Sequence, residues 1–370
     1  MQVIKKERDS NIELYRIFLM LFIIAHHYVV HSGLVNVFYE NLFSSKTIYL
    51  SIFGAWGKVG INCFILITGY FMCKSNISLK KFLKLLLEVE FYKIILYIFF
   101  CIIGQDSFQI MNLVKTILPI RLVSNNFVTC YIIFYLFIPF VNILIKNVSK
   151  KQHLIIIALL FFVISILGNI PIINMQFNYL TLFLMIYLIG AYIRLYGIKL
   201  LENRKKCIFI NILLFTLCIG SIILGMFIYK QFDKKMLYYF INDSNKVLAV
   251  LLSISFFYLF KNIKMKSCKF INIIASSIFG VLLIHNGDIP LNGVTQVRFF
   301  LWEKVFKVLE VYNESFIYVL FHSIISVLII FIVCTIIDQV RIKFIEEPFF
   351  KVTSNKIDKM ESWIKKKIIN

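Results

Sequence analysis

The sequence has few charged residues, and acidic residues are the scarcest. Asp and Glu number 19 against 40 Lys and Arg, and charged residues make up 16% of the 370 positions. Soluble domains carry about 25% charged residues, so this composition excludes an ordinary soluble domain. Proline is also rare, with five residues, and no Pro-, Gly- or Ser-rich linker separates a second domain.

Several sequence signatures of pumps and enzymes are missing. The chain has no Gly-rich phosphate-binding loop and no dinucleotide-binding fingerprint, which argues against a nucleotide-driven pump. It has no G-x-S-x-G elbow, and no C-x-x-C pair occurs among its eight cysteines. The sequence therefore gives no indication of covalent catalysis through a serine or a thiol.

The chain is instead rich in long apolar segments. Hydrophobic residues make up 60% of the sequence, including 39 Phe, and the mean hydropathy is +0.84. Because a membrane-spanning helix needs about 20 apolar residues, we predict an all-α polytopic membrane protein, a bundle of about ten transmembrane helices. The predicted spans are residues 13–31, 48–72, 86–104, 127–145, 154–170, 179–196, 207–229, 241–260, 270–288 and 316–338.

The net charge of +21 follows a pattern that indicates membrane topology rather than nucleic-acid binding. Lys and Arg gather in alternate loops, for example at 80–84 and 204–206, and the positive-inside rule then places both termini in the cytoplasm. No cleavable secretory signal is evident. We divide the chain into a transmembrane domain, residues 1–340, and a basic, amphipathic cytoplasmic tail, residues 341–370.

The first span holds two ionisable side chains that are costly in lipid, Arg16 and His27. They lie eleven positions apart, which on a helix is about 20° in rotation and ~16 Å in height. They therefore share one face and can line one cavity. Ionisable residues within a span usually mark a reaction or transport path. Glu13, one turn before Arg16, can pair with it and offset its desolvation.

Several strings of residues resemble one known family. The run Arg8-Asp9-Ser10-Asn11-Ile12-Glu13-Leu14-Tyr15-Arg16, followed by His26-His27, resembles the opening of the acyltransferase 3 family of membrane-bound O-acyltransferases, whose first helix carries an arginine and a histidine separated by ten residues. Two positions depart from the family pattern, since a Ser is commoner than Thr68 and a Trp often replaces Asn126. Later strings follow in the family's order: Trp56-Gly57-Lys58-Val59-Gly60-Ile61-Asn62-Cys63-Phe64, Ile67-Thr68-Gly69-Tyr70-Phe71, Phe127-Val128-Thr129-Cys130-Tyr131 with Tyr135, Pro139-Phe140-Val141-Asn142, Gly190-Ala191-Tyr192-Ile193-Arg194, Ser277-Ile278-Phe279-Gly280 with Leu283-Ile284-His285, and Ile345-Glu346-Glu347-Pro348-Phe349.

The resemblance implies transfer of an acyl group, usually acetyl from acetyl-CoA, to a hydroxyl of a cell-surface sugar or glycan precursor. It also implies that residues 1–340 form the acyltransferase domain of a multi-pass protein in a bacterial cell membrane. The expected partners are acyl-CoA as co-substrate, a sugar or polysaccharide acceptor and membrane lipids. We expect no metal and no nucleic acid.

The first span suits this chemistry. A sugar hydroxyl is a poor nucleophile, so attack on a thioester requires a base, and imidazole, with an unperturbed pKa near 6.5, suits that role. His27 is the predicted general base, with an acidic partner expected to fix its tautomer. Arg16, supported by Glu13, is the predicted anchor for CoA phosphates, because guanidinium binds phosphate bidentately. The pantetheine arm could then run along the helix face towards His27.

Further candidates lie in later spans, each with a simpler structural interpretation. Glycines allow close helix packing, and polar residues often bond neighbouring helices. His27 and His31 have a spacing that can hold a metal, but no third ligand is nearby in sequence. The candidates for cofactor binding are Gly57, Gly60, Asn62 and Thr68, and those for substrate binding are Tyr131, Tyr135, Asn142 and His285.

Two other classes of protein fit the same composition. A secondary transporter or glycan flippase would also need many helices and a buried Arg/His site, but we find no inverted repeat and few Gly or Pro breaks in matched halves. A catalytically idle partner in a polysaccharide assembly complex would tolerate loss of His27. Arg16 and Glu13 could equally form a structural ion pair, with the arginine reaching the headgroups.

Overall fold

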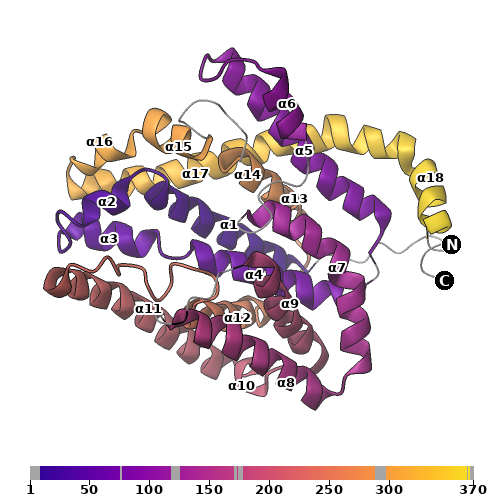
Figure 1. Ribbon diagram of the computed structural model, residues 1–370, viewed down its shortest axis with the longest axis horizontal. Helices are drawn as coiled ribbons and strands as arrows, with labels where there is room; N and C mark the ends of the chain where they lie inside the picture. Colours follow the sequence, from indigo (N-terminus) through magenta and orange to yellow (C-terminus); the bar gives the residue numbers. More distant parts are fainter. Residues whose placement is uncertain are drawn as a thin grey trace.

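The computed structural model describes residues 9–75, 77–117, 126–170, 173, 178–287, 297–364 and 366. Within these residues the protein is helical, with no β-strand (Figure 1), which confirms the all-α prediction for this part of the chain. The helices are α1 (Ser10–Val30), α2 (Leu34–Phe38), α3 (Ser45–Phe53), α4 (Gly57–Met72), α5 (Leu79–Ile102), α6 (Ile110–Ile117), α7 (Phe127–Asn147), α8 (Lys150–Phe161), α9 (Tyr179–Tyr196), α10 (Lys199–Glu202), α11 (Arg204–Phe232), α12 (Val247–Lys261), α13 (Lys269–Ser276), α14 (Ile278–His285), α15 (Val297–Phe300), α16 (Val308–Tyr312), α17 (Phe316–Arg341) and α18 (Glu347–Ile364).

Seven of the described helical stretches are long and apolar enough to cross a membrane. The other three predicted spans fall on α5, whose charged side chains all lie between Lys80 and Lys93, and on two shorter apolar stretches, α12 and the α13–α14 pair. The chain is therefore a multi-pass membrane protein, while the total of about ten spans and the cytoplasmic termini stay predictions. The seven stretches are Ser10–Val30, Ser45–Met72, Phe127–Asn147, Lys150–Asn169, Tyr179–Tyr196, Arg204–Phe232 and Phe316–Ile364.

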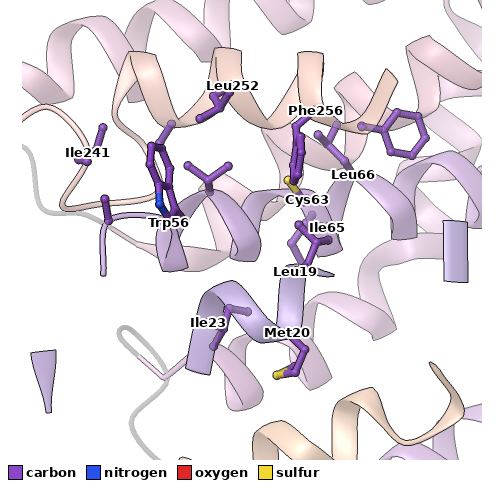
Figure 2. Packing of buried hydrophobic residues seen from close by; sticks show 14 of the residues in the cluster. Leu19, Met20, Ile23, Trp56, Cys63, Ile65, Leu66, Ile241, Leu252 and Phe256 are labelled. Atoms are coloured by element: carbon purple, nitrogen blue, oxygen red, sulfur yellow. The ribbon is translucent and has the colours of Figure 1, made fainter. Parts of the chain in front are cut away.

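Helix α4 lies between α1 and α12 in the core of the bundle (Figure 2). Leu19 of α1 and Phe256 of α12 both belong to the apolar cluster that surrounds α4. Cys63 and Leu66 of α4 are fully buried within this cluster. Because α4 is enclosed on both sides, its position relative to α1 is fixed. The packing of α4 against α1 forms one wall of the site described below.

Glycines allow two of the close helix contacts. Where α4 crosses α9, a Cβ on Gly69 would collide with the backbone of Tyr187, and a Cβ on Gly190 would collide with the backbone of α4. At the start of α4, a Cβ on Gly57 would collide with the His26 ring on α1. Small residues at helix contacts let membrane helices approach closely, and here they hold α4 against both α9 and α1.

The ninth predicted span is divided at Ser277 into α13 and α14. The side-chain amide nitrogen of Gln339, on α17, lies 2.9 Å from the carbonyl of Ile273 and 3.0 and 2.7 Å from the hydroxyls of Ser276 and Ser277. A neighbouring helix thus satisfies the polar groups that the break leaves open, as a membrane requires. This fixes α14, which carries His285 at its end, against α17.

The boundary predicted at residue 341 falls within a continuous helical segment. The chain stays helical from α17 through a short π-helical segment, Ile342–Glu346, into α18. Arg341 is buried, and its guanidinium binds Asp338 (2.8 Å), Glu346 (2.8 Å) and Glu88 of α5 (3.1 Å). Because a buried arginine needs such partners, Arg341 belongs to the helix bundle.

Candidate active site

A polar cavity of about 630 Å³ lies beside α1. Its wall includes residues of α4, α5, α6, α7, α9, α14 and α15 as well as α1. Two regions of the lining are named here by their residues. The Arg16 end is lined by Glu13, Arg16, Lys81, Lys84 and Glu88, and the His31 end by His31, Lys58, Lys115 and Arg298.

Arg16 and His27 both line this cavity, so they share one face of α1, as their spacing predicts. The two flanks of α1 on either side of this face are held by fully buried apolar residues, Tyr15 on one flank and Ile24 on the other. The rotation of α1 is therefore set by its packing, and the two ionisable side chains point into the cavity. Their chemical roles stay predictions.

The hydrogen bonds of His27 define which of its ring nitrogens is basic. His285 Nδ1 lies 2.6 Å from the carbonyl oxygen of Val281, and because a carbonyl only accepts, this nitrogen carries the proton. In neutral His285, Nε2 is then an acceptor, and it lies 2.9 Å from His27 Nδ1. His27 Nδ1 must donate, which leaves the lone pair of neutral His27 on Nε2. No described side chain bonds this Nε2.

The partner of His27 differs in chemical type from the expected one. The sequence predicted an acidic partner, whereas the structure places a second imidazole, His285, in that position. His285 is fully buried and does not line the cavity, so it acts on the site only through His27. The sequence predicted a substrate-binding role for His285, and this role stays a prediction; the structure shows its Nε2 in contact with His27 Nδ1.

The neighbouring histidines contribute to the same wall. The ring of His31 lies 4.6 Å from that of His27, centroid to centroid, and contacts Phe299. His26 Nδ1 lies 2.6 Å from the carbonyl of Gly54, which suits a structural role. The described residues contain no group of three or more His, Cys, Asp or Glu side chains placed to hold a metal ion.

Arg16 forms an ion pair with Glu13 at 2.8 Å, through its Nη1 atom. The side chain of Arg16 keeps 26% of its surface exposed, so its guanidinium is accessible from the cavity. Near this pair in the same wall, the hydroxyls of Thr68 and Tyr131 lie 3.3 Å apart. The Arg16 end thus presents one guanidinium and two hydroxyls to a ligand.

Four of the seven remaining candidates lie away from the cavity. The cavity is lined by Gly57, Thr68 and Tyr131. Gly57 also packs against His26, so cofactor binding and close helix packing both stay open as roles for this glycine. The residues outside the lining are Gly60, which packs against Ile23; Asn62, which donates to the Ser244 carbonyl (2.7 Å); Tyr135, which stacks with Phe82; and Asn142, which bonds Tyr187 (2.7 Å).

Sequence reasoning missed a buried charged cluster beside the Arg16 end. Glu88 of α5 lines the cavity and pairs with Arg341, and Tyr92 donates to Asp338 (2.7 Å). Asp338 in turn packs against Gly280 of α14, so the cluster fixes α5, α14 and α17 to one another. Glu88 and Asp338 lie within predicted spans. Because a charged side chain in a span is costly, this position alone indicates that the residue has a functional or a structural role.

The fold and the cavity together define a helical membrane protein with an accessible imidazole nitrogen and a guanidinium in one polar site. A family model described as acyltransferase domain matches residues 9–337, most of the chain. The chain therefore belongs to the acyltransferase 3 family and is a membrane acyltransferase. No curated protein and no solved structure matches it.

Proposed function

We propose that this acyltransferase moves an acyl group, acetyl in the simplest case, from acyl-CoA to a hydroxyl of a cell-surface glycan or its precursor in a bacterial cell membrane. The observation that carries the proposal is the shared cavity of His27 and Arg16. Its two groups match the two requirements of the reaction, a base for the hydroxyl proton and a ligand for the phosphates of CoA.

In the proposed reaction, Nε2 of His27 takes the proton of the acceptor hydroxyl while the hydroxyl oxygen attacks the thioester carbonyl. The tetrahedral intermediate then breaks its C–S bond and releases CoA as a thiolate, to which His27 returns the proton. The products are the ester and free CoA, and His27 is neutral again. His285 keeps Nδ1 of His27 in the donor role throughout, so that only Nε2 exchanges the proton.

The charges near Arg16 support the orientation proposed for the donor. Lys81 and Lys84 line the same end of the cavity, and cations favour the phosphates of CoA there. The helix spacing of ~16 Å between Arg16 and His27 leaves room for the pantetheine arm between the phosphates and the thioester. The acyl carbon would then lie beside His27.

The function is tested by transfer of a labelled group. Purified protein in nanodiscs is incubated with acetyl-CoA, labelled in the acetyl group, and fractionated surface glycans from the source cells. We expect label to appear in a glycan fraction in an alkali-labile form, as an ester, with stoichiometric release of CoA thiol. In a parallel assay in sealed proteoliposomes, movement of a glycan across the bilayer without consumption of acetyl-CoA would instead identify a transporter or flippase.

Replacing His285 with alanine should lower kcat by about 10- to 100-fold, by analogy with the loss of a partner that orients a metal-ligating histidine. His27 keeps its place in the cavity, but its tautomer is no longer fixed. The dissociation constant for acetyl-CoA should stay unchanged. His153 is a matched control, because it is also fully buried and bonds a backbone carbonyl, that of Leu188 (3.1 Å), outside the cavity. Wild-type kcat in folded His285→Ala protein would contradict the positioning role.

A further inference from the structure

Three cations from separate elements line the His31 end of the cavity. Lys58 lies in the first turn of α4, Lys115 is near the end of α6, and Arg298 belongs to α15. The helices α6 and α15 both pack around Tyr97 and Phe100 at the end of α5, and Figure 1 shows both along one edge of the bundle. The tertiary fold therefore brings together charges that are far apart in sequence.

No described carboxylate forms an ion pair with any of these three cations. The ammonium group of Lys58 is 3.5 Å from the hydroxyl of Tyr179. Arg298 lies against the Phe299 ring at 5.1 Å, and its buried Nε atom has no hydrogen-bond partner. Lys115 is exposed, whereas Lys58 and Arg298 are partly buried, and partly buried cations in a membrane protein are costly unless an anion compensates them.

Three of the other lining cations are already compensated by the chain itself, whereas Lys81, at the Arg16 end, is exposed and forms no ion pair with a described carboxylate. Arg16 pairs with Glu13, and Lys84 pairs with Glu346 at 2.5 Å. Lys93, between the two ends, pairs with Glu90 at 3.2 Å. The excess positive charge among the described lining residues is therefore concentrated at the His31 end, beside the base.

The position of this positive charge relative to His27 indicates which of the two substrates would bind there. Lys58 follows Gly57, which packs against His26. The positive charges of Lys58 and Arg298 both interact electrostatically with His31, which lies one helical turn after His27. When the thioester lies beside His27, the pantetheine arm holds the CoA phosphates away from that histidine. An anion close to His27 must then belong to the molecule whose hydroxyl is acylated.

We propose that Lys58, Lys115 and Arg298 form a subsite for an anionic group of the acceptor, a phosphate or a carboxylate carried by the sugar that receives the acyl group. This inference rests on the proposed function, since it takes His27 as the base. It narrows the acceptor from glycans in general to acidic ones. Lys and Arg hold phosphate and carboxylate groups through charge-assisted hydrogen bonds.

The test measures binding and does not depend on turnover. Protein in nanodiscs of zwitterionic lipid, which offers no competing anionic headgroup, is titrated with a hexose 6-phosphate, a hexuronate and a neutral methyl hexoside. The wild type should bind the two anionic sugars at least about 10-fold more tightly than the neutral one. The Lys58→Gln/Arg298→Gln variant should lose this preference and keep its affinity for acetyl-CoA. Lys93→Gln, a lining cation that is paired within the chain, should behave as the wild type.

Each alternative result has a definite meaning. Equal affinity of the wild type for anionic and neutral sugars overturns the subsite, as does a Lys58→Gln/Arg298→Gln variant that retains the preference. If this variant loses affinity for acetyl-CoA instead, the three cations serve the donor and the proposal is wrong. If the anionic preference depends on the cations but no labelled ester ever forms, the subsite stands and the proposed transfer reaction fails.

Discussion

Replacing His27 with alanine is expected to reduce kcat by about 10²- to 10⁴-fold, the contribution typical of a positioned general base. The reason is that Nε2 of His27 is the imidazole nitrogen left with a lone pair at the cavity wall by the bond to His285. The dissociation constant for acetyl-CoA should stay unchanged, because the phosphates bind about three helical turns away. Labelled acetyl transfer and equilibrium binding of acetyl-CoA give the two values.

His26 provides the control for this variant. It is the adjacent histidine and also lines the cavity, but its Nδ1 bonds the carbonyl of Gly54 and it packs against Gly57. Folded His26→Ala protein should keep most of its kcat. If His27→Ala retained wild-type turnover while His26→Ala lost it, the assignment of the base would be wrong.

Replacing Arg16 with alanine is expected to weaken acetyl-CoA binding by roughly 10- to 100-fold, because hydrogen bonds to charged groups contribute ~1.5–3 kcal/mol each. Turnover at saturating acetyl-CoA should fall much less than it does in His27→Ala. Binding of dephospho-CoA and of CoA to wild type and variant shows in addition whether Arg16 contacts the 3′-phosphate or the diphosphate.

Arg194 is the matched control for Arg16. It is a partly buried arginine on α9 that stacks on the ring of Tyr70 and donates to its hydroxyl (3.0 Å), outside the cavity. Arg194→Ala should therefore bind acetyl-CoA as the wild type does. Equal affinity of Arg16→Ala and the wild type would refute the phosphate role and leave the Arg16–Glu13 pair as a structural element.

The sequence was sufficient to predict the features that depend on local regularity. The apolar segments predicted the helical membrane protein, because helix length in a membrane follows from the thickness of the bilayer. The spacing of Arg16 and His27 predicted their common face, because the period of the helix is fixed. The cavity that both residues line confirms that geometry.

Features that depend on contacts between distant segments could not be predicted in this way. The partner of His27 lies 258 positions away, and no periodicity within either segment relates the two residues. The three cations of the His31 end come from three elements with no common sequence motif. Asn62 bonds a carbonyl in the connection before α12, and Asn142 bonds a carbonyl at the end of α4, because a polar side chain in a membrane helix must find a partner wherever packing places it.

The boundary at residue 341 was predicted from the basic, amphipathic sequence that follows it, and it stays a prediction. A basic residue at the end of a span resembles the start of a cytoplasmic tail, and only the tertiary structure shows three carboxylates around Arg341. The same buried cluster holds α5 and α17 together beside the cavity. Charged residues in the loops of a membrane protein thus indicate its topology, whereas charged residues within the bundle indicate how its helices pack.

The most direct measurement is an electron cryo-microscopy structure of the protein with a non-hydrolysable acyl-CoA analogue bound. We expect the phosphates of the analogue to contact the Arg16 guanidinium, and its acyl carbonyl carbon to lie within reach of a hydroxyl hydrogen-bonded to His27 Nε2. An analogue bound in the reverse orientation, with its phosphates at Lys58 and Arg298, or bound outside this cavity, would contradict the account.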